Sequence, residues 1–153
     1  MPTSPIVQLQ LALGVLAIAL ALWKGGAPER LAALAVVGNI AAGMIADAVE
    51  ARGGALWTFA NDGLTAFIML AVTLRWARPW LGAVMFFYAA QFTLHAAYMA
   101  TGRDPNDYLH AVVNNIIFTG TILSLGAGAI AAWRGRVRQA RSAAGSSSPA
   151  RRR

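Results

Sequence analysis

The chain has 153 residues, of which 58% are hydrophobic and 12% are charged, whereas a soluble domain carries roughly 25% charged residues. Apolar runs of bilayer-crossing length recur along it, which excludes a soluble globular fold. Cysteine is absent, which excludes disulfides and thiolate metal sites. The formal charge of +7 lies mostly at helix ends and in the tail, a distribution that membrane topology explains and that argues against nucleic acid as a partner.

The apolar runs predict an all-α fold, a polytopic membrane bundle spanning residues 1–133. Five transmembrane helices are expected at about residues 6–23, 29–50, 56–76, 79–100 and 105–133. Residues 134–153 are rich in arginine, serine and alanine and have no apolar surface to bury. They are predicted to form a disordered cytoplasmic tail.

The first helix is interpreted as an uncleaved membrane anchor. No lysine or arginine precedes it, whereas Lys24 follows it directly. A cleavable signal peptide shows the reverse order, with a basic start and a small-residue cleavage site. The start of the chain is therefore expected outside the cell membrane.

The third helix contains Asn61-Asp62-Gly63, a sequence that would indicate a turn in a soluble protein. If the helix began after Gly63, its apolar remainder would be too short to cross the bilayer. Non-helical backbone at that depth is tolerated only where protein shields it from lipid. We therefore expect the helix to continue through Asp62 rather than re-enter the membrane.

The fifth helix has the clearest start signal in the chain. Asp104 suits the N-cap, Pro105 the first helical position and Asp107 the third. This arrangement is a variant of the capping box, in which an acidic side chain near the helix start binds free backbone N–H groups.

The distribution of basic residues predicts the orientation of the bundle. Eleven of the 13 basic residues fall on one side when the start is placed outside and the tail in the cytoplasm. Only Arg52 and Arg103 then lie outside, as the positive-inside rule requires. Most of the tryptophans also fall at the inner interface, where indole rings prefer to lie.

This orientation gathers polar residues from four helices in the outer half of the membrane. They are Asp47, Glu50, Asn61, Asp62, Gln91, His95, His110 and Asn114, with Asn39 on the same face of its helix as Asp47 and Glu50. Ionisable groups are expensive in hydrocarbon, so they are expected to face one another rather than lipid.

Three interpretations of this cluster remain open. It can tie the helices together through hydrogen bonds. It can bind a cofactor, with His95 and His110 as axial ligands of a haem b, or with Asp47 or Asp62 beside both histidines around a divalent metal. It can also handle protons or ions in an oligomer. No nucleophile–base pair, phosphate loop or metalloprotease motif is present, so an enzyme is the least supported class.

Two smaller patterns also have alternative explanations. Gly120, Ser124 and Gly128 are spaced four residues apart, as are Gly38 and Ala42, which favours close helix packing within the chain or a homodimer seam. The arginine tail fits a topology anchor or a contact with anionic lipid.

Residues 24 to about 100 resemble a group of small hydrophobic proteins encoded in alphaproteobacterial genomes, a group with no assigned activity. The matching features are the turn with Gly26, Pro28, Glu29 and Arg30, the acidic Asp62, the turn with Arg78, Pro79 and Trp80, and the pair Gln91 and His95. Asn114, Asn115 and the long arginine tail depart from that group. The resemblance implies a bacterial inner membrane and no mechanism.

Together these patterns indicate a multi-pass inner-membrane protein whose activity the sequence does not assign. A structural or interaction subunit is the best-supported role, and a haem- or metal-binding protein is the alternative. Its expected partners are the lipid bilayer and either further copies of the chain or a larger membrane complex.

Overall fold

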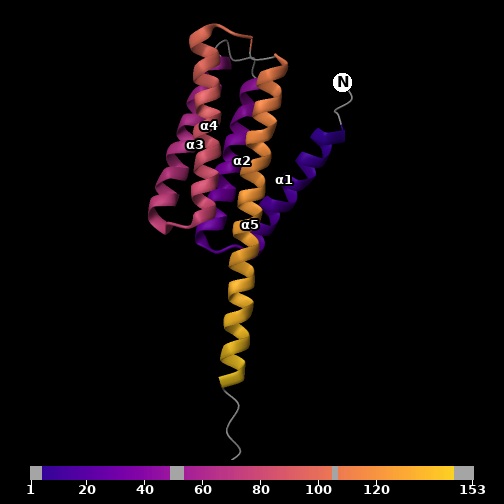
Figure 1. Cartoon of the computed structure of the whole chain (residues 1–153), viewed down its shortest axis with the longest axis vertical. Coiled ribbons are helices and arrows are strands. Elements are labelled where there is room, and N and C mark those ends of the chain that lie inside the picture. The colour runs from indigo at the N-terminus through magenta and orange to yellow at the C-terminus, as the bar shows by residue number, and fades with distance from the viewer. Residues whose placement is uncertain (1–4, 49–53, 105–106, 147–153) are drawn as a thin grey trace, which may run out of the picture.

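The computed structural model describes residues 5–48, 54–104 and 107–146, which form five α-helices and no strand (Figure 1). The helices are α1 (Pro5–Lys24), α2 (Ala27–Ala48), α3 (Gly54–Trp76), α4 (Pro79–Thr101) and α5 (Tyr108–Ser146). The predicted all-helical class is confirmed. Four helices, α1, α2, α3 and α5, are long and apolar enough to cross a membrane. The sequence of α4 is interrupted by Tyr88, Gln91 and His95, and α4 is not among these four.

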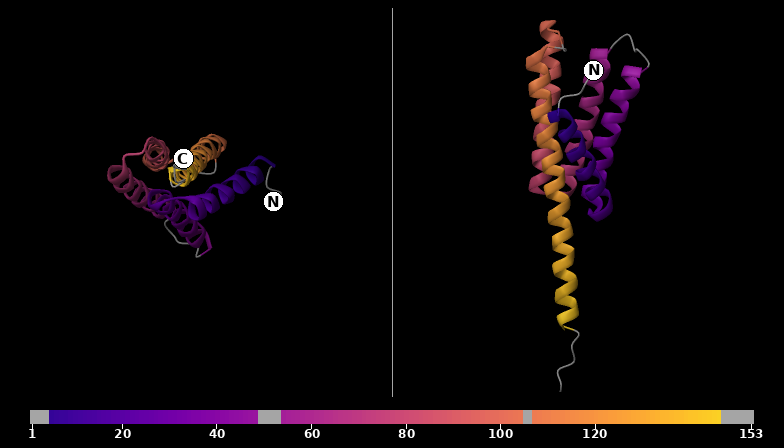
Figure 2. Two further views of the ribbon diagram at one scale, coloured as in Figure 1. Left: turned by 90° about the horizontal axis from the view of Figure 1, so that it is seen from below. Right: turned by 90° about the vertical axis from the view of Figure 1, so that its right-hand side faces the viewer.

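The helices α2 to α5 form an antiparallel bundle against which α1 leans at an angle. In chain order α2 packs on α3, α3 on α4 and α4 on α5, and α1 packs mainly on α5. The start of α1 stands away from the other helices, and α5 runs well past the end of the bundle (Figures 1 and 2). The α1–α2 and α3–α4 turns lie at one end of the bundle, and the α4–α5 turn lies at the other.

The third helix is continuous through Asn61-Asp62-Gly63, as predicted. Gly63 is suited to this position because α4 approaches it closely. A Cβ atom at Gly63 would lie 3.1 Å from the ring of Phe92. The turn-like tripeptide therefore reflects close packing of α3 on α4 together with a buried carboxylate, and the backbone does not turn there.

Both predicted ends of the fifth helix need correction. The helix begins at Tyr108, and its N-cap is Asp107 rather than Asp104. Asp107 Oδ1 accepts the backbone N–H of His110 at 2.7 Å, which is the bond that an N-cap side chain makes. Pro105 lies outside the described residues.

At its other end α5 does not stop at Trp133 but continues to Ser146. The sequence predicted disorder there because the segment has few large apolar residues. Alanine and arginine are nevertheless strong helix formers, and extending a helix that already exists costs far less than nucleating a new one. Residues 147–153 lie outside the described part of the chain.

The apolar core lies at the end of the bundle that carries the α1–α2 turn. Its fully buried members include Ala21, Val36, Met69, Leu81 and Leu125. Small residues on different helices let the backbones approach, and larger side chains fill the space between them.

Gly120 and Gly128, two of the small residues spaced four apart on α5, pack against other helices of the same chain. A Cβ at Gly120 would lie 2.1 Å from the ring of Phe87, and a Cβ at Gly128 would lie 2.4 Å from the ring of Trp80. Both aromatic residues belong to α4. The two glycines thus let aromatic side chains of α4 pack directly on the backbone of α5. Close packing within the chain therefore explains the spacing of these small residues.

Candidate functional site

A buried carboxylate, Asp62 of α3, is the centre of the polar residues at the other end of the bundle. Only 2% of Asp62 is exposed. Asn39 of α2 donates to its Oδ1 at 3.0 Å, and Gln91 of α4 donates to the same oxygen at 3.4 Å. His95 Nδ1, also from α4, lies 2.5 Å from Oδ2. We call Asn39, Asp62, Gln91, His95 and His110 the Asp62 cluster.

Amide side chains tie α2 to α3 beside this carboxylate. The Asn39 amide also donates to Thr65 Oγ1 at 3.1 Å. In the opposite direction, the Asn61 amide donates to the backbone carbonyl of Asn39 at 2.9 Å. The pair of helices is therefore joined by reciprocal bonds, and Asn39 uses its side chain and its backbone in the same contact.

The two histidines lie face to face. The rings of His95 and His110 are stacked, with centroids 5.1 Å apart and planes 28° apart. One side of the pair is anchored, because His95 contacts Asp62. On the other side, His110 Nε2 is buried and has no hydrogen-bond partner in the described part of the chain. An unpartnered buried ring nitrogen is a position where a proton or a water molecule would be stabilised.

Tyr98 and Asp107 extend this arrangement to the surface at the α4–α5 turn. The Tyr98 ring meets His110 edge-on at 4.8 Å, and its hydroxyl donates to Asp107 Oδ1 at 2.8 Å. Arg103 donates to Asp107 at 2.9 Å and lies over the Tyr98 ring. The backbone N–H of His110, helped by Tyr98 and Arg103, lowers the pKa of Asp107 below its ordinary value.

Three of the polar residues predicted to meet here are not part of the contacts described above. The side chains of Asp47 and Glu50 lie outside the described residues. Asn114 is half-buried on α5, one turn beyond His110, and makes none of the hydrogen bonds to Asp62. The remaining predicted residues, Asn39, Asn61, Asp62, Gln91, His95 and His110, are brought together.

The geometry does not suit a haem held between His95 and His110. Axial ligands face each other across the iron with the porphyrin between them, whereas these two rings are in stacked contact and leave no space for that plane. Nor do three acidic, histidine or cysteine side chains converge on one metal position anywhere in the described residues.

Sequence reasoning missed three contributors to the site. Thr65 is 4% exposed and shares the Asn39 amide with Asp62. Its position, one turn after Asn61, is the signal that could have identified it. Tyr98 was not singled out as a site residue, and Asp107 was interpreted only as part of a helix cap. The closeness of the two across the turn, nine residues apart, depends on how α4 ends at Gly102.

No protein-family profile, curated protein or solved structure matches this chain.

Proposed function

We propose that the chain is a multi-pass protein of a bacterial inner membrane with five spans, its start outside and its tail inside. The positive-inside distribution supports this orientation. α4 has 23 residues, which gives it a length of about 35 Å. It lies between α3 and α5 and runs antiparallel to both, so its length and its neighbours support a fifth crossing. The bacterial location follows the resemblance of residues 24–100.

In this membrane the protein acts as a structural or interaction subunit, in a homo-oligomer or a larger complex, and the Asp62 cluster makes its packing depend on proton binding. The observation that supports this role is the contact between buried Asp62 and His95, with a second imidazole stacked on the first. Asn39 and Gln91 extend the same contact to α2 and along α4. A change of charge at Asp62 or His95 would therefore alter the hydrogen bonds that join α2, α3 and α4.

The cluster is suited to hold one proton more readily than two. A carboxylate and two neutral imidazoles leave a net negative charge in the hydrocarbon, which is expensive. One added proton on His95 makes a neutral carboxylate–imidazolium pair. A second proton on His110 would place two cations at a ring separation of 5.1 Å, and like charges at that distance repel strongly in a low dielectric.

Proton access is expected from the outer end only. His110, Tyr98 and Asp107 form a line of polar groups to the surface at the α4–α5 turn. Towards the opposite end the bundle is filled by apolar side chains such as Met69, Leu81 and Leu125. An uptake site without a path through the membrane fits a proton-responsive subunit better than a proton transporter.

The charged and titratable groups that face the histidines come from α3, α4, α5 and the α4–α5 turn. They are Asp62, Tyr88, Tyr98, His110, Arg103 and Asp107. From α2 the described side chain at the cluster is the neutral Asn39.

Labelled histidine gives a direct test, because the chain contains only two histidines. The full chain with isotope-labelled histidine, in detergent or lipid, would be followed by NMR from about pH 5 to about pH 8. The proposal expects the signals of the two stacked rings to change together rather than independently. His95→Gln and His110→Gln assign the signals, and each variant should shift the titration of the remaining ring.

The matched control is Thr93→Val, which lies on α4 and is exposed. It should leave the titration unchanged. Two rings that titrate independently, or two rings that stay neutral throughout, would contradict the proposal. The second result would leave a purely structural role for the cluster.

A further inference from the structure

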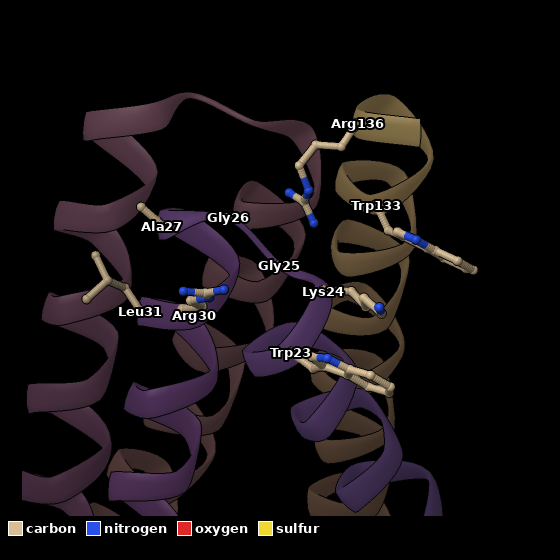
Figure 3. A pocket seen from close by; sticks show the side chains of 9 residues that line it. All are labelled: Trp23, Lys24, Gly25, Gly26, Ala27, Arg30, Leu31, Trp133 and Arg136. Carbon is tan, nitrogen blue, oxygen red and sulfur yellow. The ribbon is translucent and has the colours of Figure 1, made fainter. Parts of the chain in front are cut away.

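A cavity opens at the end of the bundle opposite the Asp62 cluster, between the α1–α2 turn and the part of α5 that extends past the bundle. Its volume is about 760 Å³. Figure 3 shows the residues that line it: Trp23, Lys24, Gly25, Gly26, Ala27, Arg30, Leu31, Trp133 and Arg136. The cavity exists because α5 continues as a helix beyond Trp133 and presents Arg136 to the turn.

Three cations from three helices surround this cavity. Lys24 ends α1, Arg30 lies in the first turn of α2, and Arg136 extends from α5 toward Gly26. None of the three makes an ion pair with another described residue. We call Lys24, Arg30 and Arg136 the cation pocket.

Glu29 is the acidic residue beside the pocket in the described part of the chain, and its single carboxylate leaves the three cations with a net positive charge. Glu29 is 1% exposed, and its Oε2 accepts the backbone N–H of Gly26 at 2.8 Å. Its carboxylate thus serves to close the α1–α2 turn.

Two tryptophans place the cavity at the level of lipid headgroups. Trp23 and Trp133 line it, and they are 75% and 43% exposed. The Lys24 ammonium lies 4.1 Å from the Trp23 ring, in a cation–π contact. Indole rings prefer the membrane–water interface, where one face of the ring meets hydrocarbon and its N–H meets water.

An apolar groove of about 520 Å³ lies on the same two helices, α1 and α2. Its lining reaches from Leu22, the sequence neighbour of Trp23 in the cation pocket, to Leu11 on α1 and Met44 on α2. Its lining is aliphatic apart from Met44 and the ring of Phe118. A free phosphate or a soluble nucleotide would make no favourable contact with this apolar surface, whereas the acyl chain of a phospholipid would.

We propose that the cation pocket and the apolar groove together bind one anionic phospholipid. Lys24, Arg30 and Arg136 would hold the phosphate and the anionic headgroup, and one acyl chain would lie between α1 and α2. This inference is independent of the Asp62 cluster. It uses the proposed orientation only to assign the lipid to the inner leaflet, where basic pockets between helices recognise anionic headgroups.

The test uses the purified full chain and native mass spectrometry. Phosphatidylglycerol is compared with phosphatidylcholine of the same acyl chains and with glycerol 3-phosphate, which has the charge but no chain. The proposal expects one tightly retained phosphatidylglycerol, weaker retention of phosphatidylcholine, and no retained glycerol 3-phosphate. Equal retention of the two lipids would show an apolar groove without headgroup recognition, and binding of glycerol 3-phosphate alone would show an anion site without a lipid. Either result overturns the proposal.

Matched variants separate the pocket from the general charge of the chain. Lys24→Gln, Arg30→Gln and Arg136→Gln combined should lower phosphatidylglycerol affinity by about tenfold or more, since each basic residue near an anionic surface contributes roughly fivefold. The control removes the same charge from the same end of the protein, by Arg134→Gln, Arg138→Gln and Arg141→Gln. An equal loss in both variants would assign the effect to the basic end of α5 as a whole and overturn the pocket.

A second pair of substitutions tests the groove. Ala19→Leu with Ala41→Leu places bulk in the groove from α1 and α2, on residues that are exposed and outside the core. Retention of phosphatidylglycerol should fall, and the histidine titration should stay as in the unaltered chain. Unchanged lipid retention would contradict the placement of the acyl chain. Failure of the histidine titration would leave the lipid result standing, because the two measurements report on opposite ends of the bundle.

Discussion

The two ends of the bundle are held together by different kinds of contact. At the end with the α4–α5 turn, Asp62 gathers donors from α2 and α4. At the end with the α1–α2 turn, alanine, valine and leucine fill the core, and Trp80 is seated on Gly128. The first end depends on particular atoms being present, so it should fail when a partner is removed. The second depends on shape, so it should fail when volume is added.

The largest expected effect is the loss of the carboxylate in Asp62→Ala. Three donors, from Asn39, Gln91 and His95, would lose their acceptor in a buried site. Removing one partner of a buried charged pair costs about 3–5 kcal/mol. The free energy of unfolding in mixed detergent measures this loss. Asp62→Asn keeps the volume and one acceptor oxygen and should cost less. Equal stability of Asp62→Ala and the unaltered chain would show that this end is also held by shape.

At the apolar end, Gly128→Ala should destabilise the bundle by about 1–3 kcal/mol, because the added methyl group overpacks a filled core. The new Cβ would lie 2.4 Å from the ring of Trp80 on α4, a half-buried residue whose ring nitrogen is buried. The control is Gly135→Ala on the same helix, where a Cβ meets nothing within 4 Å. That substitution should raise stability by up to about 1 kcal/mol through helix propensity. A gain of stability in both variants would show that helix propensity outweighs the Trp80 contact.

A smaller effect is expected where α1 meets α5. Gln10 donates to Thr119 Oγ1 at 2.7 Å and to the backbone carbonyl of Asn115 at 3.3 Å, both on α5. Gln10→Leu should cost about 0.6 kcal/mol, the average for a hydrogen bond between membrane helices. Leu16→Ala, at an exposed position of the same helix, is the control for general effects on α1. A loss of stability several times larger would show that α1 is held against α5 mainly by the hydrogen bonds of Gln10.

The smallest effect should be seen in the pH dependence of Asp107→Asn. The folded protein lowers the pKa of Asp107, chiefly through the His110 N–H. A lowered pKa contributes stability that is fully present above the unfolded value of about 3.9 and is lost as the pH falls through the folded value. The unaltered chain should therefore exceed Asp107→Asn in thermal stability at neutral pH, and the difference should shrink in acid. A difference that grows in acid would mean that the sign of the shift is wrong.

Much of the architecture could be predicted from local patterns. The apolar runs predicted all five helices, because bilayer-length hydrophobic segments leave few alternatives. The continuity of α3 through Asp62 followed from length alone, since a helix starting after Gly63 would be too short. The expected gathering of Asp62, His95 and His110 rested on a count of polar residues at one depth, and it required no knowledge of which helices are neighbours.

The contacts that the sequence could not supply are those set by rotation and by chain ends. Depth in the membrane does not fix the direction of a side chain around its helix. For this reason the sequence could not predict that Asp62 contacts His95 or that His95 stacks on His110. The end of α5 was misplaced for another reason. Hydrophobicity reports where lipid stops, and a helix rich in alanine and arginine can continue into water.

Because α5 is one unbroken helix, it carries both His110 of the Asp62 cluster and Arg136 of the cation pocket. His110 and Arg136 stand on it about 39 Å apart, at 1.5 Å per residue. A rigid rod turns as a whole, so any rotation that brought the ring of His110 to a new partner would swing the guanidinium of Arg136 through the same angle. If the proposed proton binding turned α5 at His110, the lipid contact proposed at Arg136 would change through the helix itself.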